Sequence, residues 1–470
     1  MRRPAPPSLE GLTAASFGLL GLVIGSRPIA DNSAFTHIRT GIDALAGRGI
    51  PRTDPYSFTA RGEEWVVQSW LMSFLYGLAH RLAGFEGVVV INALLTGFLA
   101  VLLVCLVRTG SVLRTAGAAA AALFAGALYW SQRPLLTGLV CMAAVLLVVT
   151  RRHSPLWLLP VMWIWVNSHG TYPLAVIWLG LHVFGVASEA RSIDDLRRLI
   201  DPYLAYGAAM AGGIALGGIN PLGPKLLLFP LQVTERPEIF RAIVEWRSPD
   251  FGRPGGLVTL VAIGVCLGVL LVRRTPPAHA LPVVVFFVAG LFAQRNLPVA
   301  ALVFAPALGA ALAVNHDRAS REAPSFHFVL TAALVAIGGG VLASAFSREP
   351  LRVVRYPVAA VASLEDQGVI DGSRRLIHED KVGAYLILQR GTEANVFVDD
   401  RAGLYEPQVI RDLLDLQRGE RVLEILEDHD AEAVLWERGS GVDAAVSADP
   451  GWRSVHRDDD WVAFVRRSAR

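Results

Sequence analysis

Lysine and cysteine are scarce in this sequence. Of the 470 residues, only Lys225 and Lys381 are lysines. Every other residue in the combined lysine and arginine total is an arginine. No basic block of the kind that binds nucleic acid is present, so we expect no nucleic-acid partner. The three cysteines, Cys105, Cys141 and Cys266, lie inside apolar runs. They fit neither a disulfide framework nor a zinc spacing and are expected to pack as small apolar side chains.

Several motifs that carry chemistry are also missing. The sequence contains no P-loop, no GxGxxG after a strand, no HExxH and no GxSxG, which argues against a nucleotide-driven pump. No charged residue stands in the middle of an apolar run, where the ion or proton path of a secondary transporter should leave one.

Apolar residues dominate what is present. They make up 53% of the chain and charged residues only 18%, against about 25% in soluble domains, and the mean hydropathy is +0.45. A membrane crossing needs roughly 20 apolar residues, and runs such as 86–107 are too long and too apolar for a soluble protein with buried helices. The fold class predicted is an all-α polytopic membrane protein with about eleven spans: 11–30, 86–107, 113–131, 134–150, 154–169, 172–188, 202–219, 255–272, 278–293, 297–314 and 325–346.

Segment 64–83 is either a twelfth span or a helix on the membrane surface. Cytoplasmic loops carry an excess of arginine and lysine. If 64–83 does not cross, every inside loop is basic, and the N-terminus, which shows no evident cleavable signal, is cytoplasmic. We therefore expect an interfacial helix in the first external loop, 31–85. The arginines that decide this are Arg2, Arg3, Arg108, Arg114, Arg151, Arg152, Arg191, Arg197, Arg198, Arg273, Arg274, Arg318 and Arg321.

The same topology gathers the polar loops on the outer face. They are 31–85, "WSQRP" (130–134), "WVNSHGTYP" (165–173), the long loop 220–254 with "EWRSPDF", and "AQRNLP" (293–298). A functional site on that face is the simplest explanation.

The composition changes after residue 349. Short strand patterns then alternate with amphipathic helix patterns. We predict a transmembrane domain over 1–349 and a soluble, extracytoplasmic α/β domain over 350–470.

Several motifs are spread along most of the chain: "ADNSAFTHIRTG…GIPRTDPYSFTARGEEWVVQSWL", "RPLLTGLV", "WVNSHGTYPL", "INPLG", "EWRSPDF", "RNLPVAAL", "VGAYLILQ" and "VFVDDRAGLYEP". Together they resemble a bacterial group of membrane proteins with the GT-C glycosyltransferase architecture. Oligosaccharyltransferase catalytic subunits, protein O-mannosyltransferases and lipid A aminoarabinose transferases are similar in plan.

The resemblance implies a polyprenyl-phosphate-linked sugar as donor. It also implies an acidic residue, just after the first span, that acts on the acceptor at the outer leaflet. Asp31 occupies that position. Members of the group often carry a second acidic residue two positions later, but this chain has Ser33 there. A divalent cation, Mg²⁺ or Mn²⁺, is kept as a candidate cofactor, and no metal ligands are assigned.

The residues themselves also favour Asp31. Glycosyl transfer needs a base for the acceptor, and partial burial would raise the pKa of Asp31 toward a useful range. The alternative is a helix N-cap. His37 could bind the acceptor, orient Asp31 or only pack. Asp54 could serve the site or form an Asx turn, and Trp65 and Trp70 are better placed as interface anchors than as sugar platforms.

Positive groups must stabilise the leaving phosphate. Arg295, with Asn296, is the preferred contact, and Arg133 either joins it or reaches lipid headgroups. Further substrate-binding candidates are Asn167, His169, Glu245 and Trp246, each with a structural alternative as a solvated span end or an interfacial residue. Asp399, Asp400 and Arg401 are treated as a strand end and turn, structural or facing the acceptor.

The leading hypothesis is an inverting GT-C-type glycosyltransferase in a bacterial cytoplasmic membrane. Its acceptor would be a glycan, lipid or protein of the envelope, and Asp31, Asn167, Glu245 and Arg295 would share one compartment. The alternative is a non-enzymatic protein, either a transporter of a lipid intermediate or a scaffold for envelope assembly.

Overall fold

The computed structural model describes residues 8–234, 244–314, 324–354 and 356–467 and divides into two compact units. Unit 1 contains residues up to Pro28, 83–230 and 241–350, and residues 29–82 and 351–470 make up most of unit 2. The first polar loop therefore groups with the C-terminal region in unit 2. Four of the arginines used above for the topology lie outside the described residues: Arg2, Arg3, Arg318 and Arg321.

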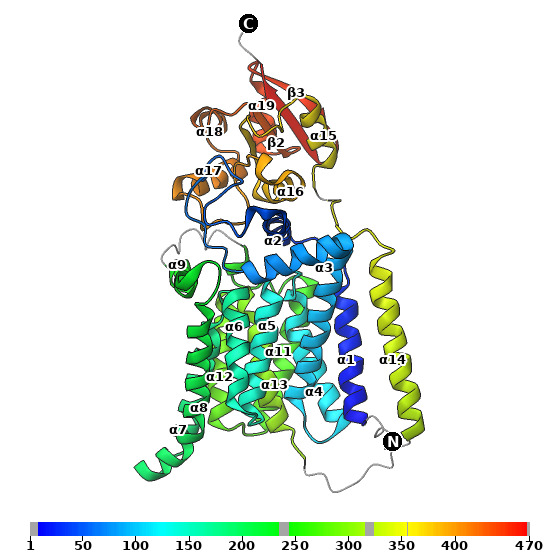
Figure 1. Ribbon diagram of the computed structural model, residues 1–470, viewed down its shortest axis with the longest axis vertical. Coiled ribbons are helices and arrows are strands. Elements are labelled where there is room, and N and C mark those ends of the chain that lie inside the picture. The colour runs from blue at the N-terminus through cyan, green and yellow to red at the C-terminus, as the bar shows by residue number, and fades with distance from the viewer. Residues whose placement is uncertain (1–7, 235–243, 315–323, 355, 468–470) are drawn as a thin grey trace. The chain divides into compact units, whose positions relative to one another are not determined.

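Unit 1 is a bundle of helices that run roughly along one direction (Figure 1). Each segment predicted to span the membrane corresponds to one helix, so the helical fold class is confirmed. The helices are α1 (Leu9–Gly25), the second half of α3 (Trp70–Val107), α4 (Val112–Gly126), α5 (Leu135–Thr150), α6 (Leu158–Ser168), α7 (Pro173–Ala187), α8 (Ile193–Gly217), α11 (Pro254–Val272), α12 (Pro277–Phe292), α13 (Leu297–Ala311) and α14 (Pro324–Ala345). The short helix α9 (Phe229–Thr234) follows α8, and the boundary of unit 1 after Pro230 falls inside it.

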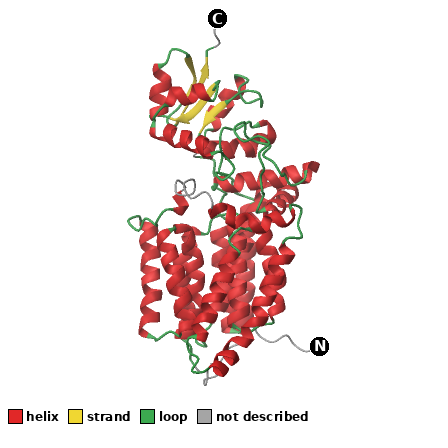
Figure 2. Cartoon of the chain, turned by 90° about the vertical axis from the view of Figure 1, so that its left-hand side faces the viewer, coloured by secondary structure: helices red, strands yellow, loops and turns green. Residues whose placement is uncertain are grey.

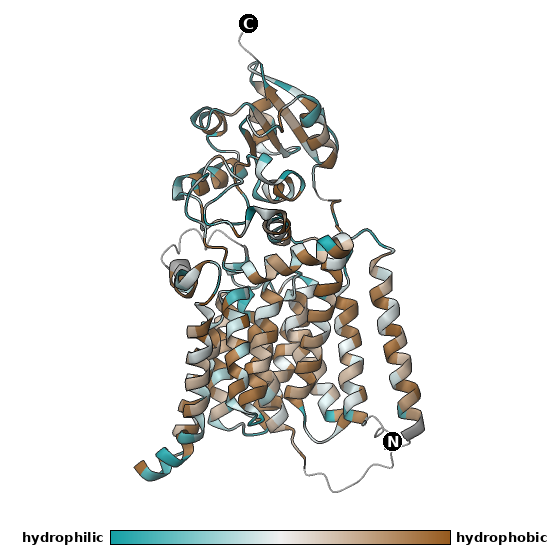
Figure 3. Ribbon diagram, viewed as in Figure 1, coloured by the Kyte–Doolittle hydropathy of each residue, from teal (hydrophilic) through white to brown (hydrophobic). Residues whose placement is uncertain are grey.

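Length and composition allow five of the described helices to cross a membrane: α3, α4 with its 3-10 extension to Tyr129, α8, α11 and α14. Helices α1, α5, α7 and α12 are shorter but apolar. Figure 3 shows the apolar colour along the bundle. Large apolar side chains such as Val261 on α11 and Val335 on α14 are exposed, which is the pattern that a lipid-facing helix needs.

The helix predicted over segment 64–83 starts later than expected. Helix α3 begins at Trp70 and not at Glu64. Residues before it are paired as a hairpin: the Asp54 N–H donates to the Glu63 carbonyl at 2.9 Å, and the Trp65 N–H donates to the Arg52 carbonyl at 2.9 Å. Extended pairing and helix exclude one another, since both use the same backbone groups.

The two halves of α3 are separate segments, as predicted. Ala83 and Gly84 have non-helical backbone angles, with φ of −150° and +63°, and the boundary between the units falls after Leu82. Residues 70–82 therefore do not continue the span that follows. That they lie along the membrane surface stays a prediction.

Helix α2 (Asn32–Asp43) packs in unit 2 between α16 (Asp380–Arg390) and the first half of α3. Its contact with α3 is a backbone crossing. A Cβ atom on Gly41 would lie 1.8 Å from the Ser73 carbonyl oxygen, and one on Gly77 would lie 2.2 Å from the Gly41 carbonyl carbon. Only glycine permits this approach, which fixes α2 against α3.

The C-terminal part of unit 2 is the small α/β fold predicted (Figure 2). Its sheet has the order β1-β2-β4-β3, in which β1 runs parallel to β2 and the other pairs are antiparallel. Ala60 of the first loop joins its apolar core. The elements are α15 (Val358–Asp366), β1 (Leu376–His378), α16, α17 (Pro407–Arg418), α18 (Val422–Asp428), β2 (Ala433–Glu437), α19 (Gly441–Ala448), β3 (Trp452–Arg457) and β4 (Trp461–Arg466).

His378 in β1 predicts a pH dependence of stability. Its Nδ1 donates to the Glu379 carbonyl at 2.9 Å, and its Nε2 accepts from the Phe397 N–H at 3.0 Å, so the folded state holds a neutral ring. Burial lowers the pKa of His378 to about 4, against about 6.5 when unfolded. The unfolded chain thus binds more protons in this range, and the His378 contribution should fall by about 1.4 kcal/mol per pH unit as pH drops from 6.5 to 4.

The measurement compares wild type with His378→Gln, through urea midpoints of the full chain in detergent from pH 4 to 7.5. Wild type alone is insufficient, because burial raises the pKa of Asp400 and this gives the opposite slope. The difference between the two proteins isolates His378. His456→Gln, at a partly exposed ring, is the control. A difference that is flat across this range contradicts the prediction.

Candidate functional site

The polar turns of unit 1 meet at one end of its bundle. The Tyr172 hydroxyl donates to the Leu227 carbonyl at 2.7 Å, joining the turn after α6 to the segment after α8. The Gln294 N–H donates to the Arg247 carbonyl at 2.9 Å, joining the turn after α12 to the long loop. The polar loops of unit 1 thus lie at the same end, as the sequence predicted.

Arginines of the other turns gather at the opposite end of the bundle. Arg151 after α5 donates to the Leu106 carbonyl at the end of α3, at 3.0 Å. Arg108 forms an ion pair with Glu10 at the start of α1. Unit 1 therefore has a basic end and an end that carries the predicted substrate contacts.

Arg133 and Arg295, which we call the arginine pair, lie at the substrate end around one short turn. That turn is η5 (Val244–Trp246). Arg133 Nη2 lies 2.6 Å from Glu245 Oε1, and the Arg295 Cζ atom lies 4.2 Å from the centroid of the Trp246 ring. Four residues chosen separately from the sequence are thus brought together.

The positive charge of Arg133 acts on the ionisation of Arg295. Burial and the charge of Arg133 lower the pKa of Arg295, to about 10, although Glu245 opposes this shift. Arg295 therefore stays charged at neutral pH. A second anion near the pair would relieve the repulsion between two like charges.

Local sequence explains where each arginine sits. Arg133 is followed by Pro134, the N-cap of α5. Arg295 belongs to the 3-10 turn η6 (Gln294–Asn296) between α12 and α13. Asn296 donates to the Ala289 carbonyl at 3.0 Å, so its side-chain amide closes the end of α12. This contact gives Asn296 a structural role beside its predicted one.

Asn167 and His169 lie at the same end but make other contacts. The buried Asn167 amide donates to the Trp163 carbonyl at 2.8 Å and to the Gly217 carbonyl at 3.3 Å, which ties α6 to α8. His169 Nδ1 lies 2.9 Å from Thr171 Oγ1. The substrate roles of Asn167 and His169 stay predictions.

Buried polar atoms without a hydrogen-bond partner also occur at this end. Within the described part of the chain they include Trp130 Nε1, Ser131 Oγ and Ser168 Oγ. A Cβ on Gly126 would lie 3.6 Å from Trp130 Nε1 and 3.3 Å from Pro298 Cα, which places the indole N–H beside the first turn of α13. Such groups normally find a partner in protein, water or ligand.

Asp31 lies in unit 2 and caps α2, as the structural alternative predicted. Its Oδ1 accepts from the Ser33 N–H at 3.0 Å. The Ser33 side chain in turn hydrogen-bonds Asp400, and Thr36 Oγ1 donates to Asp400 Oδ1 at 2.7 Å. Asp400 from the C-terminal region thus reaches the same turn of α2 as Asp31. Burial raises the pKa of Tyr356, and the negative charges of Asp31, Asp380 and Asp400 raise it further.

His37 and Asp54 are both bound to neighbouring groups. His37 Nδ1 lies 2.9 Å from Ser73 Oγ on α3. The Tyr56 N–H donates to Asp54 Oδ1 at 3.2 Å and the Ser57 N–H donates to Asp54 Oδ2 at 3.0 Å, which is the predicted Asx turn. These contacts favour the packing and turn alternatives.

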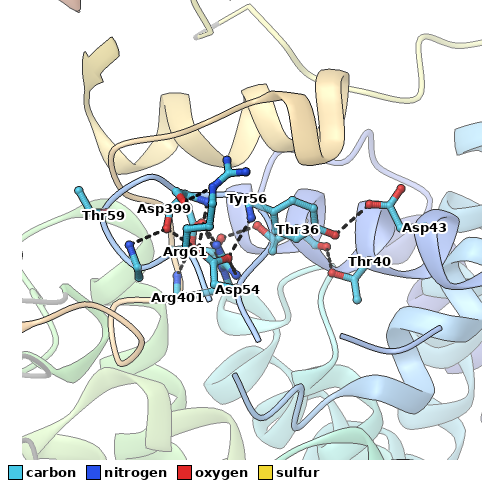
Figure 4. Close-up of polar contacts among 12 residues, drawn as sticks. Thr36, Thr40, Asp43, Asp54, Tyr56, Thr59, Arg61, Asp399 and Arg401 are labelled. Carbon is cyan, nitrogen blue, oxygen red and sulfur yellow. Dashed lines mark hydrogen bonds and ion pairs between the residues drawn. The ribbon is translucent and has the colours of Figure 1, made fainter. Parts of the chain in front are cut away.

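Arg401 is the centre of a buried ionic cluster in unit 2 (Figure 4). Its Nη1 donates to Asp54 Oδ1 at 2.6 Å, and its Nε donates to Asp399 Oδ1 at 2.8 Å. The guanidinium also lies 4.4 Å from the Trp65 ring centroid, so Trp65 packs on a cation inside the protein. The cluster fastens the first loop to the C-terminal region.

From the sequence, a strand end and turn, structural or facing the acceptor, was predicted for Asp399, Asp400 and Arg401. Their pairing with Asp54 and Thr36 was missed, because more than three hundred positions separate the partners. The one available signal was "VFVDDRAGLYEP", one of the motifs on which the resemblance described from the sequence rests. As for metal binding, the residues that the structure describes include no group of three or more His, Cys, Asp or Glu that could hold an ion.

Comparisons with known proteins find a likeness of fold. No family model and no curated protein matches the chain. Among solved structures, the chain is similar to ArnT from Cupriavidus metallidurans bound to undecaprenyl phosphate, with 14% sequence identity, 96% of each chain covered and a TM-score of 0.47. At this identity the roles of residues rest on this chain's own contacts.

Proposed function

We propose that this chain is a membrane glycosyltransferase. It would take a sugar from a polyprenyl-phosphate donor and pass it to an envelope glycan, lipid or protein at the outer face of a bacterial cytoplasmic membrane. The observation that carries the proposal is the arginine pair, two charged guanidiniums held at the end of an apolar helix bundle opposite to the one where Arg108 and Arg151 lie.

The arginine pair suits a phosphate that is attached to a lipid. Arginine presents donors in a planar fork that matches phosphate oxygens. The helices that reach this end carry exposed apolar side chains, among them Leu128 after α4 and Val258 on α11. A polyprenyl chain can lie along such a surface while its phosphate meets Arg133 and Arg295.

The reaction assigned to these groups is a displacement at the anomeric carbon. The acceptor oxygen would attack that carbon as its proton passes to a carboxylate, the role predicted for Asp31 from the sequence. The bond from the carbon to the phosphate oxygen breaks, and its electron pair leaves with the polyprenyl phosphate. The phosphate then gains negative charge, which Arg133 and Arg295 would stabilise. A single displacement of this kind inverts the configuration at the carbon.

Substituting the arginine pair tests the proposal. Arg295→Gln and Arg133→Gln should each weaken the binding of undecaprenyl phosphate by about 10- to 100-fold, since hydrogen bonds between charged groups contribute about 1.5–3 kcal/mol. Titration of the full chain in lipid nanodiscs, followed by tryptophan fluorescence, measures the affinity.

The matched control is Arg273→Gln, an exposed arginine just after α11 at the basic end, which should bind as wild type does. Equal affinity in all three variants would contradict the phosphate site. Binding that depends on the arginines, without any sugar transfer from a lipid-linked donor, would favour the transporter alternative.

A further inference from the structure

A carboxylate of the protein already occupies the arginine pair. Glu245 Oε1 lies 2.6 Å from Arg133 Nη2, and the Glu245 charge also favours the protonated form of Arg295. From the sequence, Glu245 was predicted to bind substrate. Its position against two cations indicates a different task, because a carboxylate there competes with any anionic ligand.

The charges of the site can be counted. Among the described residues, Arg133 and Arg295 contribute two positive charges and Glu245 one negative charge, so these three side chains together carry a net charge of about +1. A sugar joined to a lipid through phosphate is a phosphodiester with a charge of about −1. The phosphomonoester left after transfer carries about −1.5 to −2 at pH 7. With Glu245 in place, the net charge of these three side chains is equal and opposite to that of the diester.

We infer that Glu245 is an internal ligand of the arginine pair and makes the site favour a singly charged phosphodiester over a doubly charged phosphomonoester. This inference rests on the proposed function. The donor would bind beside Glu245, whereas the spent lipid phosphate would be repelled by the Glu245 carboxylate. Product would then leave more readily than it would from a site with two unopposed arginines.

The surroundings of Glu245 allow its charge to be removed without a rearrangement of the turn. Its side chain is 40% exposed. The turn is held independently, because the Gln294 N–H donates to the Arg247 carbonyl at 2.9 Å and Arg295 packs on Trp246. A glutamine at position 245 keeps the shape of the side chain and one acceptor for Arg133. Glu245→Gln therefore isolates the charge.

The test compares two probes with the same lipid, farnesyl monophosphate and its methyl phosphodiester. Both are titrated into the full chain in nanodiscs at pH 7.5. Wild type should bind the diester at least as tightly as the monoester. Glu245→Gln should tighten the monoester about tenfold and the diester less than about threefold, since only the monoester carries the extra charge. Glu245→Ser should change the affinities in the same direction, so the result does not depend on one variant folding.

Asp250→Asn is the matched control, because Asp250 is on the same loop but pairs with Arg253 at 3.0 Å; its selectivity should equal that of wild type. In Glu245→Gln the preference for the monoester should vanish at pH 5, where that probe keeps its second proton. A Glu245→Gln protein that binds the monoester more weakly, or tightens both probes equally, overturns the inference. Binding of neither probe by wild type would instead overturn the proposed function.

Discussion

Asp31→Asn should lower the rate of sugar transfer by about 10²- to 10⁴-fold while the protein remains folded, a loss of the size expected when a general base is removed. Asparagine is as good an N-cap as aspartate, so the hydrogen bond from the Ser33 N–H, now 3.0 Å long, should persist. The measurement is transfer from a lipid-linked sugar by purified full-length protein, together with its thermal unfolding curve.

Two further variants separate catalysis from capping. Asp31→Ala loses both functions and should cost about 1 kcal/mol of stability in addition. Asp371 makes the same kind of contact, since its Oδ1 accepts from the Ser373 N–H at 2.9 Å, but it is exposed. Asp371→Asn should leave transfer unchanged. An active Asp31→Asn beside a defective Asp31→Ala would mean that position 31 serves only the helix.

The helices were predictable because their signal is local. Runs such as 86–107 and 255–272 are apolar at every turn, and each forms a helix. The C-terminal elements alternate in pattern and also appear as expected. The predicted start of helix α3 at Glu64 was wrong. Residues 52–65 pair as a hairpin, and this pairing overrides the helix pattern of the segment that begins at Glu64.

The candidate site was predictable as a set of residues but not as an arrangement. Arg133, Glu245, Trp246 and Arg295 were each named from the sequence, and three separate elements bring them together. The sequence shows which polar residues stand at the end of an apolar run. It does not show that an acidic side chain from one loop will sit on a cation from another, because that contact depends on tertiary packing.

The contacts of Arg401 also depend on tertiary packing and were not predictable from the sequence. Substitution of Arg401 is expected to have the second large effect. Arg401→Leu should lower the free energy of opening of unit 2 by about 3–5 kcal/mol, since loss of one partner leaves buried charges uncompensated. The Arg401 side chain is 8% exposed, and those of Asp54 and Asp399 are fully buried. Hydrogen exchange of peptides from 51–68 and 396–405, measured on the full chain, reports this opening.

Arg390→Leu provides the comparison at a more exposed ion pair. Arg390 bonds Glu365 through its Nε at 2.9 Å, with side chains 39% and 31% exposed, and its loss should cost no more than about 1 kcal/mol.

Adding Asp54→Asn and Asp399→Asn to Arg401→Leu should restore part of the loss, because the deficit comes from unpaired carboxylates and not from the missing guanidinium alone. Protection in Arg401→Leu equal to wild type would show that the first loop is held by its apolar contacts, such as Ala60 in the core. Deprotection confined to 51–68 would instead show that Arg401 fastens this loop to a C-terminal fold that is stable without it.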